Sequence, residues 1–477
     1  MTVRKDTTPV PSSASRLAAA PSKPGKPRQG EPLPSGRSPL KPALMDGLAA
    51  RQAAAAAIYG VLSDGRAFED VFGQALDRNA IAPRDRAFAR AIAGAALRRR
   101  GSLTFVINQF LEKPLSVKLG RVNAILLGAA AQLLILGTPP HAAISLAVEQ
   151  CRADKAARRF DKLANAVLRR VSERGADILK TLDGTAHDIP PWLLARWRKT
   201  YGDDLARRIG EASLAEAPLD LTVKGDPKVW AEKLGGLQLV TGSVRLTSAG
   251  RIEELAGFTD GDWWVQDAAA ALPARLLGNV SGLDVADLCA APGGKTAQLV
   301  YAGAHVTALD QSESRLLRLK GNLTRLKLNA KTVVADAAFW QPNNLFDAVL
   351  VDAPCTATGT IRRHPDILHL KRPDDVAALS ITQSRILANA AKLVKSGGVL
   401  VYCSCSLESE EGVDQVTRFL ALNSGFSRVA ITAGECGVPH EWLTKDGDVR
   451  TLPVHFGDLD ADKRGLDGFY IARLKRN

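Results

Sequence analysis

The chain has 477 residues, a formal net charge of +13 at pH 7 and six cysteines. Hydrophobic residues make up 46% and charged residues 24% of it, which excludes a wholly disordered or fibrous chain, and the length predicts two or three domains. The surplus of Lys and Arg favours an anionic polymer or an anionic membrane surface as partner. The sparse cysteines exclude a disulfide scaffold and indicate a reducing, cytoplasmic location.

Residues 1–42 are rich in Pro, Ser, Gly, Lys and Arg and hold almost no large apolar residues. Such a segment cannot bury enough surface to offset its conformational entropy, so we predict a disordered basic tail. Its eight basic residues face only Asp6 and Glu31, which leaves a charge of +6 on the tail. The tail is either a solvated extension without a specific role or an arm that attracts RNA. It has no continuous apolar stretch, so we expect no secretory signal.

Residues 43–174 are predicted to be helical throughout, because apolar residues recur at spacings of three and four, as at Ile144, Ala147 and Val148. Gly and Pro residues between these stretches predict six or seven short helices in a compact bundle. The most apolar run, 122–137, is shorter than the roughly 20 residues of a membrane span, so we expect a buried core helix and no membrane insertion.

Basic clusters interrupt this helical region at 98–100, 155–159 and 169–170, and each is either a solvated helix face or a binding site. Residues 175–260 mix helical and extended patterns and are predicted to form a linker or a small RNA-binding subdomain. Within them, Trp192 and Trp197 lie among basic residues. These tryptophans are either core residues or a surface on which bases stack.

From residue 261 to 477 short β-rich runs alternate with amphipathic helices, which predicts an α/β domain with a parallel sheet covered on both faces. The loop after the first of these runs reads Asp287-Leu-Cys-Ala-Ala-Pro-Gly-Gly-Lys-Thr296. It is not a P-loop, because Cys289 stands where that motif needs glycine, and it lacks the three spaced glycines of a dinucleotide site. A different nucleoside-bearing ligand is therefore favoured.

Four acids close successive predicted strands at the carboxyl edge of this sheet, where open α/β sheets bind ligands: Asp287, Asp310, Asp336 and Asp352. Asp310 is suited to accept both hydroxyls of a ribose, and an adenine is expected beside Asp336. Each acid taken alone is equally well explained as a helix cap. The four in register favour a functional site.

Thiols follow the fourth and fifth predicted strands on the same edge. Cys355 follows Asp352-Ala-Pro, and a Cys-x-Cys pair ends the fifth strand at Cys403 and Cys405. No second pair of thiols or histidines has the spacing of a zinc site, so we predict no metal. We expect the side chains of Cys403 and Cys405 to diverge, one to the core and one to the cleft.

Several of these motifs occur together in one known family: the 287–295 loop, Asp352-Ala-Pro-Cys355, Ser404-Cys-Ser406, Arg362-Arg-His-Pro-Asp366 and the closing Asp467-Gly-Phe-Tyr470. Residues 261–477 thereby resemble RNA (cytosine-5) methyltransferases that use S-adenosylmethionine. Residues 43–174 resemble the NusB-type RNA-binding bundle. This arrangement is similar to that of the bacterial 16S rRNA methyltransferase B group. The implied fold class is an all-α NusB-like bundle followed by an α/β Rossmann-like class I methyltransferase domain.

The resemblance also implies roles for individual residues. Cys405 would be the nucleophile, Cys355 would assist breakdown of a covalent adduct, and Asp352 would hold the N3/N4 edge of the base. Lys295 would act beside Asp352 and the methyl donor. The implied cofactor-binding residues are Ala290, Ala291, Pro292, Gly293, Gly294, Lys295, Asp310, Asp336 and Asp352.

Chemistry gives an independent reason for a thiol, because C5 of cytosine is too weak a nucleophile until a thiolate adds at C6. Residue logic alone leaves open which cysteine adds, since DNA cytosine-5 methyltransferases use the one in the Pro-Cys turn. The expected partner is 16S rRNA or a small-subunit assembly intermediate, and we expect a monomer. Two alternatives remain: the same chemistry on tRNA or another RNA, and a NusB-like assembly factor without catalytic activity.

Overall fold

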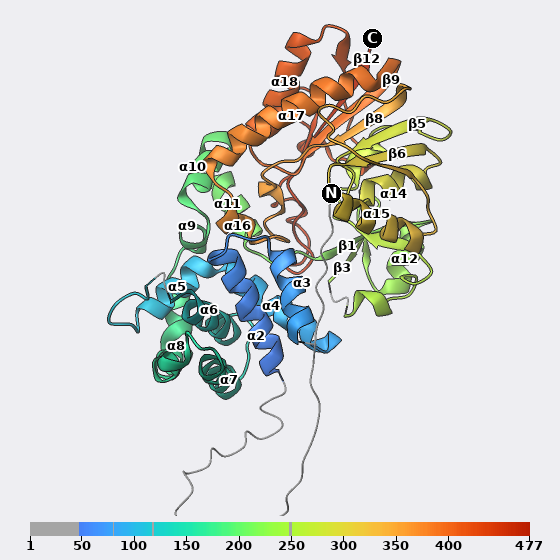
Figure 1. The fold of residues 1–477 in the computed structure, drawn as a ribbon. Coiled ribbons are helices and arrows are strands. Elements are labelled where there is room, and N and C mark those ends of the chain that lie inside the picture. The colour runs from blue at the N-terminus through green and yellow to red at the C-terminus, as the bar shows by residue number, and fades with distance from the viewer. Residues whose placement is uncertain (1–46, 80, 117–118, 248–249) are drawn as a thin grey trace, which may run out of the picture. The chain divides into compact units, whose positions relative to one another are not determined.

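The computed structural model describes residues 47–79, 81–116, 119–247 and 250–477, and the elements carry the labels of Figure 1. The basic tail predicted at residues 1–42 lies outside these described residues. Within the described ranges, the helices are too short or too polar to cross a membrane.

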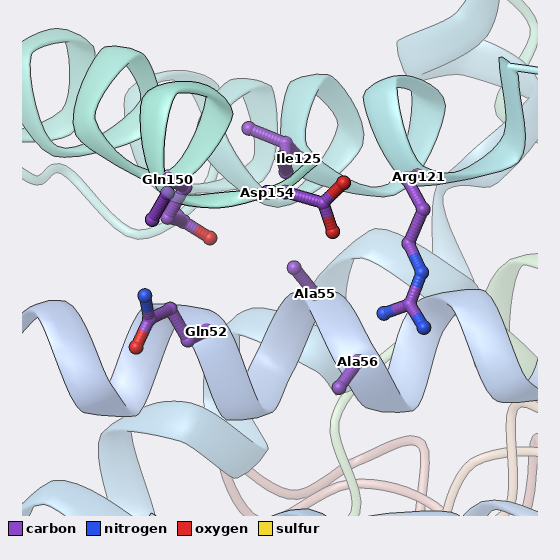
Figure 2. Close-up of a pocket in the computed structure, with 8 residues that line it drawn as sticks. Gln52, Ala55, Ala56, Arg121, Ile125, Gln150 and Asp154 are labelled. Atoms are coloured by element: carbon purple, nitrogen blue, oxygen red, sulfur yellow. The ribbon is translucent and has the colours of Figure 1, made fainter. Parts of the chain in front are cut away.

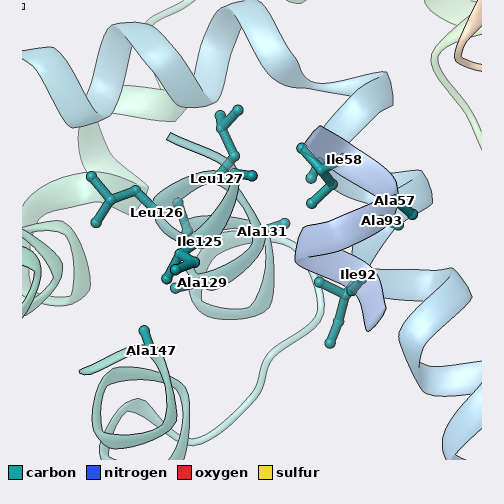
Figure 3. Packing of buried hydrophobic residues seen from close by; sticks show 14 of the residues in the cluster. Ala57, Ile58, Ile92, Ala93, Ile125, Leu126, Leu127, Ala129, Ala131 and Ala147 are labelled. Carbon is teal, nitrogen blue, oxygen red and sulfur yellow. The ribbon is translucent and has the colours of Figure 1, made fainter. Parts of the chain in front are cut away.

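The described chain begins with a bundle of helices. They are α2 (Leu48–Leu62), α3 (Phe68–Asn79), α4 (Pro83–Arg98), α5 (Arg100–Asn108), α6 (Gly120–Leu134), α7 (Pro140–Ala153) and α8 (Asp161–Lys180). Pro83 and Pro140 each begin a helix, where the missing N–H of proline has no intrahelical partner to lose. Helix α6 carries most of the apolar run 122–137. In Figure 3 its side chains lie close to Ile58 of α2 and Ile92 of α4, so the predicted core helix is confirmed.

Three helices and a small sheet follow. The helices are α9 (Gly184–Asp188), α10 (Pro191–Tyr201) and α11 (Asp203–Ser213). The sheet has the order β2-β3-β1-β4, formed by β1 (Leu219–Val223), β2 (Leu237–Gln238), β3 (Val244–Leu246) and β4 (Trp263–Val265), with α12 (Pro227–Leu234) beside it. Strand β4 lies beyond residue 260, so this sheet extends into the range 261–477 that we assigned to the α/β domain. Trp197 is buried, and its indole N–H donates to Glu408, so it belongs to the core.

The large sheet has the order β10-β12-β9-β8-β5-β6-β7, with β11 paired to β12. Its strands are β5 (Asp284–Leu288), β6 (His305–Asp310), β7 (Lys331–Val334), β8 (Phe346–Asp352), β9 (Val394–Ser404), β10 (Phe426–Arg428), β11 (Val449–Arg450) and β12 (Tyr470–Arg476). Strands β5 to β9 are parallel, as predicted. Strands β10, β11 and β12, which the sequence did not reveal, pair antiparallel, so the sheet is mixed.

The antiparallel pairing follows from where the chain re-enters the sheet. Tyr470 begins β12 opposite Ser404, the last residue of β9, so β12 enters at the edge where β9 leaves. Helices α14 (Gly294–Tyr301), α15 (Glu313–Arg325), α17 (Pro373–Leu393) and α18 (Val413–Leu422) pack beside the strands (Figure 1). Consecutive residues of β8, Val349 and Leu350, belong to different hydrophobic clusters, as expected for a sheet that is covered on both faces.

The helical bundle contacts the segment that follows the Pro-Cys turn of the catalytic domain. The buried carboxylate of Asp366 accepts the backbone N–H of Phe68 at 3.0 Å. Arg98 donates to the carbonyl of Arg362 at 2.9 Å, and a ring nitrogen of His369 lies 2.8 Å from the carbonyl of Leu97. The bundle therefore packs against residues 362–369, which follow the turn at Cys355.

Candidate functional site

Two cavities lie at the carboxyl edge of the parallel strands, and the loop after β5 contributes to both. The Asp310 cavity, of about 170 Å³, is lined by residues including Cys289, Asp310, Arg315, Asp336, Phe339, Pro354 and Ile386. The Cys405 cavity, of about 500 Å³, is lined by residues including Trp264, Asp267, Ala290, Pro292, Gly293, Gly294, Lys295, Asp352, Arg363, His364, Cys405, Asp467 and Phe469. The predicted site residues thus gather at one edge of the sheet.

The Asp310 cavity holds two of the predicted acids. Asp310 ends β6, is 2% exposed, and accepts the backbone N–H of Ala291 at 3.3 Å. The Arg315 guanidinium lies 3.2 Å from Asp310 Oδ2, the oxygen that also accepts the Ala291 N–H, and the same arginine donates to the Ala291 carbonyl. Asp336 caps the turn after β7 by accepting the N–H of Ala338 at 2.8 Å, and it also lines the cavity. Asp336 therefore caps a turn and also faces a cavity, so it is consistent both with a capping role and with a ligand-binding role.

The loop after β5 approaches the Cys405 cavity with small residues. Gly293 has φ +103°, and a Cβ there would lie 2.8 Å from Leu319 Cγ, so only glycine fits without a shift. Helix α14 begins at Gly294, which leaves the N–H groups of its first turn at the edge of the sheet. Ala290, Pro292, Gly293 and Gly294 line the Cys405 cavity, whereas Ala291 is turned to Asp310 and Arg315.

Lys295 and Asp352 form an ion pair in the Cys405 cavity. The Lys295 Nζ donates to Asp352 Oδ2 at 2.8 Å, and the Lys295 side chain is 9% exposed whereas that of Asp352 is 32% exposed. Burial lowers the pKa of Lys295, but the charge and the hydrogen bond of Asp352, together with the nearby thiols of Cys403 and Cys405, outweigh burial and hold this pKa above its ordinary value. Lys295 therefore remains a cation that orients the Asp352 carboxylate toward the cavity.

The two turns that follow β8 and β9 bring two thiols together. The Sγ atoms of Cys355 and Cys405 lie 3.4 Å apart, and Cys405 lines the cavity. A hydrogen bond to Cys405, together with burial, raises the pKa of the Cys355 thiol well above its ordinary value. Cys403, inside β9, is fully buried, and its thiol lies 3.5 Å from Asp352 Oδ1. Cys403 is therefore buried, whereas Cys405 lines the cavity. Strand alternation does not explain this difference, because residues two apart share a face of a strand; β9 ends at Ser404, so Cys405 belongs to the turn that follows.

One of the four strand-end acids does not reach either cavity. Asp287 precedes the last residue of β5 and is fully buried, and it accepts the Thr296 hydroxyl at 2.6 Å. Burial raises the pKa of Asp287 to about 7. Its carboxyl group lies beneath the site and holds the first turn of α14.

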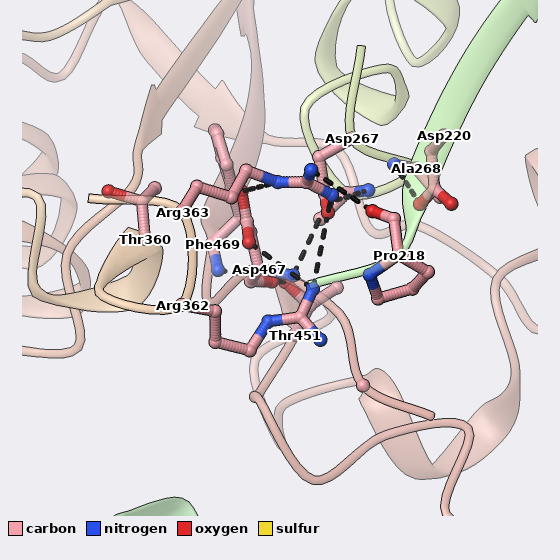
Figure 4. A network of polar contacts seen from close by, with 12 residues as sticks. Pro218, Asp220, Asp267, Ala268, Thr360, Arg362, Arg363, Thr451, Asp467 and Phe469 are labelled. Carbon is pink, nitrogen blue, oxygen red and sulfur yellow. Dashed lines mark hydrogen bonds and ion pairs between the residues drawn. The ribbon is translucent and has the colours of Figure 1, made fainter. Parts of the chain in front are cut away.

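A buried ionic network forms part of the Cys405 cavity wall (Figure 4). Arg363 donates to Asp267 at 2.6 Å and to Asp467 at 3.2 Å, and Arg362 lies 3.5 Å from Asp467. A Cβ at Gly359 would lie 2.0 Å from the Gly468 carbonyl oxygen, so this glycine lets the closing segment pack against the Cys355 turn. Sequence reasoning noted residues 362–363 and 467 but gave them no role, and it missed Asp267.

Metal chemistry has no candidate cluster in the described part of the chain. There, no group of three or more His, Cys, Asp or Glu side chains is arranged to hold a metal ion.

A second group of candidate binding residues lies on the helical bundle. A cavity of about 270 Å³ separates α2 from α6 and α7, and Figure 2 shows Arg121 at one end of it. Arg121 also lines a hollow of about 610 Å³ together with Tyr59, Lys155, Arg158 and Arg159, which we call the Arg121 hollow. The Arg121 guanidinium lies 4.2 Å from the centre of the Tyr59 ring. Four exposed cations therefore surround one concave surface.

Two solved structures share this fold. PH0851 aligns with a TM-score of 0.69 and 21% identity over 90% of this chain and 99% of its own. NSun6 from Pyrococcus horikoshii, solved with SFG, aligns with a TM-score of 0.50 and 19% identity over 60% of this chain and 98% of its own. At these identities the likeness concerns the fold alone.

Sequence comparison is more specific. The 16S rRNA methyltransferase RsmB/F family model matches residues 275–475, and the NusB family model matches residues 48–173, which confirms the predicted fold class. Ribosomal RNA small subunit methyltransferase B from Xanthomonas campestris is 37% identical over 392 residues, covering 78% of this chain and 88% of that protein. Its namesake from Xylella fastidiosa strain Temecula1 is 35% identical over 447 residues, covering 90% and 99%. The chain therefore belongs to the RsmB/F family of 16S rRNA methyltransferases and carries a NusB-family domain before its catalytic domain.

Proposed function

We propose that this protein transfers a methyl group from S-adenosylmethionine to C5 of a cytosine in 16S rRNA, through a covalent bond between Cys405 and C6 of the base. The observation that carries this proposal is the pair of thiols 3.4 Å apart at a cavity that also holds the Lys295–Asp352 ion pair. We further propose that it acts as a monomer in the cytoplasm.

The residues at the carboxyl edge of the large sheet suit the binding of S-adenosylmethionine. The Asp310 cavity offers a buried carboxylate for ribose hydroxyls and, beside Asp336, apolar surface from Ile386 and Phe339 for an adenine. The loop 290–294 would hold the methionine portion, because its small residues let the backbone approach a ligand closely. When bound, S-adenosylmethionine would supply an electrophilic methyl group, and its sulfur would keep the electron pair of the broken S–CH3 bond and leave as a neutral thioether.

The chain's own residues then activate the base. The Cys405 thiolate adds to C6, so that the ring becomes an enamine whose C5 can form a bond to the methyl carbon. Asp352, oriented by Lys295, binds the N3/N4 edge of the cytosine and stabilises the charge that develops there. Cys355 keeps its proton during addition, because a hydrogen bond to Cys405 and burial raise its pKa. Cys405 lines the cavity and is the thiol that reaches the base.

Release of the product reverses the addition. The C5 proton leaves to a base, its electron pair forms the C5–C6 double bond, and the C6–S bond breaks toward Cys405. The Cys355 thiol lies 3.4 Å from that sulfur and stabilises it by a hydrogen bond as it leaves. Cys355 thus assists breakdown of the adduct.

RNA would reach this site through phosphate contacts on the bundle. The Arg121 hollow has exposed cations from two segments and an aromatic ring, which suit a phosphate backbone. The target base must be unstacked to enter the Cys405 cavity, so a loop or an assembly intermediate is a better substrate than an intact duplex.

Replacing Arg158 and Arg159 together by glutamine should weaken RNA binding and reduce the salt slope, log Kd against log salt, by about two, since each phosphate contact releases about one counterion. Filter binding across a range of KCl concentrations measures both quantities. Arg152→Gln is the matched control, because this exposed bundle arginine is paired with Glu149 and Asp161. An unchanged slope in the double variant, or an equal change in the control, would contradict binding at this hollow.

The function is tested by mapping 5-methylcytosine across total RNA from cells with and without this protein. We expect a cytosine of 16S rRNA to lose its methyl group in the cells that lack the protein. If only tRNA loses a methyl group, the substrate is tRNA and not 16S rRNA. An unchanged map would favour an assembly factor without catalytic activity.

A further inference from the structure

A buried polar network joins the Cys355 turn to the Cys405 turn behind the two thiols. Its centre is Glu411, which ends the short 3₁₀ helix Ser409–Glu411 and is fully buried. None of the mechanistic steps above uses this carboxylate. The residues that follow the two cysteines, Thr356 and Ser406, are fully buried as well.

Glu411 binds the Cys355 turn directly. One carboxylate oxygen accepts the backbone N–H of Thr356 at 2.9 Å, and the other accepts the Thr356 hydroxyl. The residue after Cys355 is therefore held through both its main chain and its side chain.

The Cys405 turn joins the same network through Ser406. The Ser406 hydroxyl lies 3.2 Å from the Thr356 hydroxyl, which donates to Glu411, and 3.3 Å from that of Thr358. The backbone N–H of Gly359 donates to the Cys405 carbonyl at 2.9 Å, which adds a direct link between the turns. The network thus fixes the residues on both sides of the thiol pair.

Glu411 is itself fixed by two neighbouring elements. Gln383 of α17 donates to its carboxylate at 3.1 Å and to the Pro354 carbonyl at 2.9 Å. The Tyr402 hydroxyl of β9 donates to the Glu411 carbonyl at 2.9 Å. The contacts described here to the carboxylate come from neutral donors, and a buried carboxylate of this kind is retained only where its hydrogen bonds are satisfied.

We propose that Glu411 is a positioning residue that holds the Cys355 turn against the Cys405 turn, so that the Cys355 thiol stays within hydrogen-bond reach of the Cys405 sulfur. This inference rests on the proposed function of the two cysteines. The negative charge of Glu411 also contributes to raising the pKa of Cys355, after the hydrogen bond to Cys405 and burial. Glu411 therefore keeps Cys355 close and protonated.

Glu411→Gln tests this with little change of shape. A carboxamide puts an NH₂ group where a carboxylate oxygen accepts hydrogen bonds, and it removes the charge beside Cys355. We expect kcat to fall at least tenfold, with KM for RNA and for S-adenosylmethionine within twofold of wild type. Because adduct breakdown is slowed, a protein–RNA adduct that survives denaturation should build up during turnover. Thr356→Val, which removes only the hydroxyl donor, should cause a smaller change of the same kind.

Glu408→Gln is the matched control. Glu408 is a buried carboxylate on the same segment, but its side chain binds Arg196 and Trp197. The Glu408→Gln variant should have a lower melting temperature but should not accumulate the protein–RNA adduct. The proposal is overturned if Glu411→Gln keeps kcat within twofold of wild type, or if Glu408→Gln lowers kcat and accumulates adduct equally. Cys405→Ala in the same assay distinguishes a failure of the Glu411 proposal from a failure of the proposed function. If Cys405→Ala still transfers methyl groups, the proposed function itself is wrong.

Discussion

Cys405→Ala is expected to lower the rate of methyl transfer by a factor on the order of 10⁴ or more, because loss of a nucleophile removes the whole covalent route. Without a thiolate at C6, the C5 atom of cytosine remains too weak a nucleophile to take the methyl group. The measurement is the initial rate of transfer of labelled methyl groups to RNA, with RNA affinity determined in parallel. Affinity should change little, since the bundle supplies the proposed phosphate contacts.

Cys403→Ala is the matched control for this variant. Cys403 lies two residues away, but it is fully buried in β9 and is assigned no bond to the base. Its substitution should leave the transfer rate within a few-fold of wild type. Methyl transfer that persists in Cys405→Ala, or that is lost only in Cys403→Ala, would show that the nucleophile has been assigned to the wrong residue.

Cys355→Ala is expected to trap the enzyme on its RNA. The Cys355 thiol lies 3.4 Å from Cys405 and assists departure of its sulfur, so without it the C6–S bond should form and then break slowly. With labelled RNA and S-adenosylmethionine, a band at the combined mass should appear on a denaturing gel and account for a large share of the enzyme. Turnover should stop after about one methyl group per enzyme molecule.

The double variant Cys355→Ala with Cys405→Ala separates this trap from tight non-covalent binding. It should bind RNA but give no band on the denaturing gel. A band in the double variant would mean that another residue forms the bond. Normal turnover in Cys355→Ala would contradict the release role of Cys355.

Much of the catalytic edge could be predicted because it depends on local patterns. Parallel strands end at one edge, so acids and thiols that close successive strands must gather there, and Asp310, Asp352 and Cys405 do so. Cys405 lies beyond the end of β9 at Ser404 and lines the cavity, whereas Cys403 stays buried within the strand. Asp287 differs because it lies one residue before the end of its strand, which directs it beneath the site.

The rest of the site depends on contacts between distant parts of the chain, which no local pattern reveals. The backbone N–H of Asp467 donates to Asp267, 200 residues away, and Arg363 bridges the two acids. Strand β12 also pairs antiparallel only because the long segment before it returns along the carboxyl edge. A single sequence shows that residues such as Arg363 are charged, but it does not show which charges neutralise them in the core.

In the proposed mechanism, Cys405 carries the methylated base and Cys355 assists its release. It is tested most directly by isolating the adduct formed by Cys355→Ala, digesting protein and RNA, and locating the modified cysteine by mass spectrometry. We predict a methylated cytidine nucleotide on the peptide that contains Cys405. The same mass on Cys403 or another cysteine, or its absence from the Cys405 peptide of a denaturation-resistant adduct, would contradict this account.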